Sequence, residues 1–312
     1  MSPPPAPIWT FVSSLPLPKG LQLPDNVQRW IPGSSPFSTH TEVFAALAAY
    51  LAIIFGGQFL MKGSKPFPGD EILKGGRQRS GPCGFTRVGR DNAPQGGSAE
   101  LKPLFMLHNF LLSAGSGLVL ALMIEELIPI IWNHGWFYAI CNTAAWTPRL
   151  ETLYIINYYV HWELADTCFL VVKKKPLMFL HVFHHTATAA LCYTQLNGRT
   201  SVSWVPIVAN LTVHVLMYLT TLQITQFVVD LFIVYFASYA YFAATYFLGQ
   251  LPSPGSCAGT EGAAIFGCAL LTSYLFLFIA FYKKTYNAQV AAGKNKKAAA
   301  KGSAKAVAAK TN

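Results

Sequence analysis

Three histidines lie together inside an apolar stretch of the chain. His181, His184 and His185 fall within the run Leu177–Leu196, and their spacing of three and four places them on one helix face. Ionisable residues inside a membrane segment are rare and usually functional. A neutral imidazole can accept an acyl group from a thioester or act as a general base. Acyl transfer is therefore one chemistry that this cluster could carry out.

Further polar side chains occupy the neighbouring apolar runs. Carboxylates there are costly unless paired, and amide groups at helical spacing can face a polar interior or stabilise an oxyanion. We expect these residues to meet the histidines or a polar substrate. They are His214, Asn210 one helical turn before it, Glu163 and Asp166 at a spacing of three, and Gln223 and Gln226.

A His-x-x-His-His box also occurs in di-iron desaturases and hydroxylases. Those sites need several boxes whose histidines converge, whereas this chain has one box and its other histidines are widely spaced. The residues therefore favour acyl transfer, and no metal site is expected. A di-iron enzyme remains the first alternative, and a transporter or receptor with a polar bundle interior remains the second.

The composition assigns these polar residues to a membrane protein. Of the 312 residues, 53% are hydrophobic and only 12% are charged, against about 25% in a typical soluble domain. So few charges could not cover a soluble fold of this size, but a bilayer removes that need. The net charge of +10 is then expected to reflect oriented loops and anionic ligands rather than nucleic acid.

The apolar runs predict an all-α, multi-pass protein with seven transmembrane helices. A 45-residue run, Trp204–Leu248, would form a helix of about 67 Å, twice the hydrocarbon core, so it must be two spans. Between His214 and Gln226, however, no Gly, Pro, Lys or Arg is present to make the turn. The other predicted spans are Val43–Met61, Leu104–Ile124, Leu150–Val172, Leu177–Leu196 and Ala264–Tyr282.

The basic residues orient this arrangement. In the seven-span topology 19 Lys and Arg fall on one side and four on the other, which predicts a cytosolic C-terminus and a lumenal N-terminus. The predicted organisation is a lumenal segment at 1–42, a membrane domain at 43–282 and a basic cytosolic tail at 283–312. The cytosolic insert at 63–102 and the Lys/Ala-rich end of the tail, 291–312, are expected to lack order. No cleaved secretory signal is expected.

The same topology predicts the state of the cysteines. Cys141 and Cys257 fall in two lumenal loops, where disulfides are permitted, so a bridge between them is expected. Cys83 falls in the cytosolic insert. The remaining thiols, Cys168, Cys192 and Cys268, lie in spans and are expected to be free.

Several motifs in a fixed order resemble the ELO family of fatty acid elongases, the 3-oxoacyl-CoA synthases of the endoplasmic reticulum. The resemblance covers most of residues 40–290, and the text around Leu191–Leu196 resembles the fungal very-long-chain branch. The motifs are Thr147–Tyr154, Glu163–Thr167, Lys173–Pro176, His181–His185, His214–Tyr218 and Gln223–Phe227.

The resemblance implies six helices in a barrel around a narrow tunnel, with a seventh outside. It implies condensation of acyl-CoA with malonyl-CoA without a metal or redox cofactor, in the endoplasmic reticulum membrane, alongside the reductases and dehydratase of the elongation cycle. By family analogy His184 accepts the acyl group with His214 as its partner, while His181, His185 and Asp166 orient groups or relay protons. The expected substrate-binding residues are Glu163, Asn210, Gln223, Gln226, Lys173, Lys174, Lys175, Lys283 and Lys284, with the lysines placed at the CoA phosphates.

The chain departs from the family pattern in three places. Val160 stands where the family has a Lys, and about forty residues intervene between Met61 and Leu104 where the family has almost none. A polar, basic linker expected after Tyr218 is missing. We expect the forty-residue insertion to be a translated intron and the missing linker to be a skipped segment. Loss of the linker would impair the active site of this chain.

Overall fold

The computed structural model describes residues 6–16, 24–61, 102–159, 163–172, 177–216, 220–247 and 250–308. Every regular element in these ranges is helical. The short elements are α1 (Pro7–Ser14), α2 (Asp25–Gln28), η3 (Thr143–Ala145) and η4 (Ser201–Ser203). The longer helices are α3 (His40–Met61), α4 (Lys102–Cys141), α5 (Pro148–Tyr159), α6 (Glu163–Val172), α7 (Phe179–Gly198), α8 (Trp204–Val215), α9 (Thr220–Tyr246) and α10 (Glu261–Ala308).

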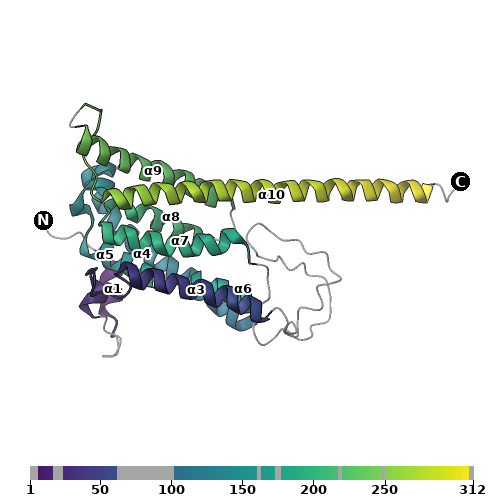
Figure 1. The fold of residues 1–312 in the computed structure, drawn as a ribbon, viewed down its shortest axis with the longest axis horizontal. Coiled ribbons are helices and arrows are strands. Elements are labelled where there is room, and N and C mark those ends of the chain that lie inside the picture. The colour runs from purple at the N-terminus through teal and green to yellow at the C-terminus, as the bar shows by residue number, and fades with distance from the viewer. Residues whose placement is uncertain are drawn as a thin grey trace.

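The longer helices run side by side in an elongated bundle (Figure 1). Four helical segments in the described residues are long and apolar enough to cross a membrane: His40–Met61, Met106–Cys141, Thr225–Tyr246 and Glu261–Lys284. The multi-pass character expected from the sequence is thus present. We call the end of the bundle at which α4 and α7 finish and α10 begins the disulfide end.

The predicted run Trp204–Leu248 is divided into two helices. Helix α8 ends at Val215, α9 begins at Thr220, and the two pack against each other, so the chain reverses between them. With only 12 residues, α8 is about 18 Å long, well short of the roughly 30 Å hydrocarbon core. Because no turn-forming residues lie between His214 and Gln226, the turn takes up residues that would otherwise extend α8, and the helix ends early at Val215.

Helix α4 continues well past the predicted boundary at Ile124. It extends to Cys141, with Pro129 inside it and a break at Gly135, whose φ of 82° lies in the left-handed region that suits glycine. The predicted boundary was wrong because the helix continues through Glu125 and Glu126, the two residues after Ile124, and both carboxylates have partners.

Those partners come from distant parts of the chain. Glu125 accepts hydrogen bonds from the backbone N–H groups of Ile8 and Trp9 at 2.7 and 3.0 Å, which caps the start of α1. Glu126 pairs with Arg149 at 3.2 Å and accepts a hydrogen bond from the hydroxyl of Thr147 at 2.8 Å. The acidic pair therefore fixes both α1 and the start of α5 to α4.

The C-terminal tail is also more ordered than expected. Instead of ending near Tyr282, α10 continues through the Lys/Ala-rich segment to Ala308 and projects beyond the bundle (Figure 1). Alanine and lysine have high helix propensity, and the membrane-spanning part supplies the nucleus that an isolated helix would lack. The predicted insert at 63–102 lies almost entirely outside the described residues.

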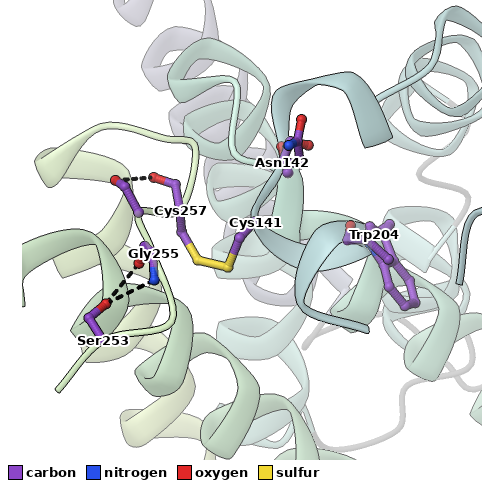
Figure 2. Close-up of a disulfide and its surroundings, with 9 residues drawn as sticks. Cys141, Asn142, Trp204, Ser253, Gly255 and Cys257 are labelled. Carbon is purple, nitrogen blue, oxygen red and sulfur yellow. Dashed lines mark hydrogen bonds between the residues drawn. A yellow bond between two sulfur atoms is a disulfide. The ribbon is translucent and has the colours of Figure 1, made fainter. Parts of the chain in front are cut away.

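A disulfide joins Cys141, the last residue of α4, to Cys257 in the loop before α10 (Figure 2). The Cα atoms are 4.0 Å apart, and Ala258 N–H donates to the Cys141 carbonyl at 2.8 Å. This is the bridge that the predicted topology required. Cys168, Cys192 and Cys268 form no disulfide, as expected.

Candidate active site

Helix α7 brings the three histidines of the box together. The ring centroids of His181 and His185 are 4.4 Å apart, and those of His184 and His185 are 5.4 Å apart. The proximity follows from helical spacing, since residues three and four apart are neighbours on the helix surface. The cluster is therefore a property of α7 itself and does not depend on how the bundle packs.

Aromatic rings from two other helices surround His184. Its ring centroid lies 5.0 Å from that of Tyr274, 6.1 Å from Phe227 and 6.2 Å from Phe278. Phe227 belongs to α9 and the other two residues to α10, so three helices meet at this imidazole. This arrangement limits water around His184, which suits a reactive acyl intermediate.

Tyr274 is a member of the site that the sequence did not indicate. It is only 2% exposed, and its hydroxyl donates to the backbone carbonyl of His184 at 3.1 Å. The same hydroxyl is 3.1 Å from that of Thr188, which can donate to it. Tyr274 thereby joins α10 to α7 at the histidine. No sequence signal set it apart, because Thr272 and Ser273 next to it also carry hydroxyls.

A cavity of about 40 Å³ begins one helical turn from His184. It lies among α5, α7, η4, α8, α9 and α10, and α7 lines it from Thr188 to Gln195. Thr188 follows His184 by four residues, so the face of α7 that carries the histidine continues into the cavity wall. Asn157 and Asn210 add amide groups to the lining.

His214 occupies the last turn of α8, four residues after Asn210. The cavity is lined by Asn210 on α8 and by Thr188 on α7. Because α7 and α8 run in opposite directions, the turn before Thr188 and the turn after Asn210 lie toward the same end of the cavity. The structure thus places both His184 and His214 beyond that end.

The remaining predicted site residues are placed in part. Gln226 donates to Asp230 at 3.3 Å, and Asp230 is 1% exposed. Lys283 and Lys284 are exposed where the membrane-length part of α10 ends. The side chains of Glu163, Asp166 and Gln223 and the whole of Lys173–Lys175 lie outside the described residues.

The sequence did not indicate that Asp230 would form a buried polar pair with Gln226. One of its carboxyl oxygens, Oδ1, has no hydrogen-bond partner among the described residues, although the side chain is buried. Its only sequence signal was that it is the sole acidic residue in the run from 204 to 248. Gln226, which was expected to bind substrate, donates a hydrogen bond to this carboxylate.

The long apolar helices and the histidine cluster are together those expected of a multi-pass membrane enzyme. The ELO, GNS1/SUR4 family profile matches residues 35–219 and 218–297, and the chain belongs to this family. It is 41% identical to Putative fatty acid elongase 1 of Schizosaccharomyces pombe over 298 aligned positions, covering 90% of this chain and 79% of that protein.

Two further relatives carry similar names. The chain is 35% identical to Putative fatty acid elongase 2 of Schizosaccharomyces pombe, covering 94% of this chain and 76% of the relative. It is 28% identical to Fatty acid elongase A of Dictyostelium discoideum, covering 83% and 88%. No solved structure matches the chain.

The alignments also contain positions that this chain lacks. For the first relative, 298 aligned positions correspond to 90% of 312 residues, or about 281, so about 17 positions face no residue here. For the second, 313 positions correspond to about 293 residues, which leaves about 20. The two segments of the family match meet at 218–219, between α8 and α9.

Proposed function

We propose that this chain condenses long-chain acyl-CoA with malonyl-CoA to give 3-oxoacyl-CoA, carbon dioxide and CoA. Membership in the ELO family makes it an enzyme of fatty acid elongation, and condensation is the step that lengthens the chain. The observation that carries the mechanism is the position of His184, enclosed by Tyr274, Phe227 and Phe278 one turn from a cavity on the same helix face.

In the proposed first step, the imidazole of His184 attacks the thioester carbonyl and CoA leaves as its thiolate. In the second, malonyl-CoA loses carbon dioxide, and the resulting enolate attacks the acyl-imidazole and releases His184. His214, His181, His185 and Asp166 would orient groups or move protons, and the amides of Asn210 and Asn157 line the neighbouring cavity. Both steps are redox-neutral, so the proposal includes no metal or redox cofactor.

The cavity would receive the acyl tail. From His184 to Gln195, α7 rises by about 16 Å, and its face lines the cavity over about the last 10 Å of that length, from Thr188 on. The CoA moiety would remain at the opposite end of the bundle, where Lys283 and Lys284 are exposed and can attract its phosphates. Lys173–Lys175 would add to this positive charge.

We also propose the topology that the basic residues indicate. Seven spans would cross the endoplasmic reticulum membrane, six of them around the acyl tunnel, with the disulfide end in the lumen and α10 emerging into the cytosol. The disulfide between Cys141 and Cys257 supports this orientation, since the lumen permits such bonds and the cytosol does not. The reductases and dehydratase of the elongation cycle would consume the product.

This chain is proposed to lack a linker after Tyr218. The 12-residue α8 and the split family match support a missing segment between α8 and α9, and the number of unmatched positions in two relatives agrees with a length of about twenty residues. Shortening α8 would shift His214 relative to His184, so the activity of this chain would be low.

The test is condensation by microsomes that contain the chain, with labelled malonyl-CoA and acyl-CoA substrates of graded length. Labelled 3-oxoacyl-CoA formed above the level of host microsomes is the expected result. Complete absence of labelled product, both from this chain and from a version with a restored linker, would contradict the proposal.

A further inference from the structure

A second cavity of about 30 Å³ lies between the first cavity and the disulfide end. Cys257 and Ala263 belong to its lining. The two cavities share three lining residues, Gln195, Val202 and Val234. Space on the disulfide side of the acyl cavity is therefore present but separated from it by a few side chains.

Gln195 is the polar member of this partition and is held at both ends of its amide. Its Nε2 donates to the carbonyl of Ala263 at 3.0 Å, and its Oε1 accepts a hydrogen bond from the hydroxyl of Thr200 at 2.6 Å. Gln195 is 8% exposed, so neither bond competes with bulk water. The amide is thus fixed across the space between α7 and α10.

Gln195 also lies on the part of α7 that leads away from His184. The cavity is lined by Thr188, Leu191, Cys192 and Gln195 in succession, and Gln195 is the last α7 residue to do so. A chain that extends from His184 along this face meets Gln195 after about 16 Å. The second cavity begins on the other side of the same amide.

Gly267 of α10 lies beside Gln195 in the wall of the first cavity. A Cβ atom built at Gly267 would lie 3.4 Å from Nε2 of Gln195 and 3.7 Å from Val234. A methyl group therefore fits in ordinary contact, but a larger side chain at this position must occupy cavity space. Gly267 and Gln195 offer opposite ways to change the depth of the same cavity.

We infer that Gln195 is the floor of the acyl cavity and sets the longest acyl chain that the protein accepts. This inference rests on the proposed function, since it assigns the cavity to the acyl tail. Removing the amide would join the two cavities, and filling the space at Gly267 would raise the floor.

The test compares three variants of the full chain in detergent. Gln195→Ala removes the partition. Gln195→Leu removes the same two hydrogen bonds but keeps a side chain of similar volume, so it is the matched control. Gly267→Val places two methyl groups at the cavity wall. Each protein is melted with saturated acyl-CoA ligands of increasing length.

In the wild-type chain, the affinity for acyl-CoA should rise by up to about 15-fold per two-carbon unit as long as the added carbons fit inside the cavity. The affinity should stop rising at the acyl length that reaches Gln195. The rise in melting temperature on ligand addition reports this limit. Gln195→Ala should move the limit to a longer chain by at least one two-carbon unit. Gln195→Leu should leave it unchanged, and Gly267→Val should move it to a shorter chain.

An unchanged limit in Gln195→Ala, or an equal shift in Gln195→Leu, would overturn the inference. If Gln195→Ala does not fold, Gly267→Val decides: an unshortened limit would overturn it. If acyl-CoA binds but the chain-length limit is the same in all variants, only the assignment of Gln195 as the floor is refuted. If acyl-CoA does not stabilise the wild-type chain and no condensation is found, the proposed function is refuted as well.

Discussion

Replacing Cys257 by alanine opens a covalent loop whose ends are 116 residues apart in sequence. The chain-entropy relation gives about 4.8 kcal/mol as the stabilisation that a crosslink across such a loop provides. Helices that stay inserted in the bilayer leave the unfolded chain less entropy to lose, so the expected cost is about 2–5 kcal/mol. The loop before α10 would also lose its covalent anchor to α4, leaving the Ala258–Cys141 hydrogen bond to hold it.

The assay is thermal unfolding of the purified protein in detergent without reductant. Cys141→Ala and Cys257→Ala should each lower the melting temperature by about 5–15 °C, and a thiol reductant should have a similar effect on the wild-type chain. The double variant should fall little further than either single variant, because one substitution already breaks the bond. Cys192→Ala, which removes a buried thiol that is in no disulfide, is the matched control.

Two results would refute this reasoning. If the single variants have the same melting temperature as Cys192→Ala, the crosslink contributes nothing to stability. If the double variant loses the sum of the two single losses, each cysteine acts through its own packing, because a shared bond can be lost only once.

Inserting a polar, basic linker of about twenty residues after Tyr218 should raise condensation activity well above that of the chain as it stands, because α8 could then extend to the membrane surface. Equal activity of the two proteins, measured with labelled malonyl-CoA, would show that the linker is dispensable. Tyr274→Phe should lower kcat about tenfold with little change in the KM for acyl-CoA, because it removes the hydrogen bond that holds the His184 carbonyl. An unchanged kcat would leave Tyr274 with a packing role only.

Comparing the lengths of the apolar runs with the thickness of a bilayer predicted the main features of the helical arrangement. A run as long as Trp204–Leu248 cannot be one span, and the structure divides it at Val215. The bridge between Cys141 and Cys257 followed from counting which loops share a side. The histidine box followed from spacing alone, because residues three and four apart meet on any helix.

Features that depend on long-range packing could not be predicted in this way. The apolar run stops before Glu126, and the partner that lets α4 continue through this carboxylate, Arg149, is 23 residues away. Tyr274 contacts the carbonyl of His184 across a separation of 90 residues, and no local pattern in an apolar span distinguishes that tyrosine from its neighbours. The partition at Gln195 depends on Thr200 and Ala263, which only the folded chain brings to the two ends of one amide.

The most direct test of the mechanism is condensation by His184→Ala, measured in the chain as it stands and in the version with a restored linker. His134→Ala is the matched control, because His134 is an exposed histidine of α4 that stacks on Tyr138, outside the histidine box. Equal expression of the variants is checked first, and labelled 3-oxoacyl-CoA is then measured. Loss of condensation in His184→Ala with activity kept in His134→Ala is the predicted result; a tenth or more of wild-type turnover in His184→Ala would contradict an obligatory acyl carrier at His184.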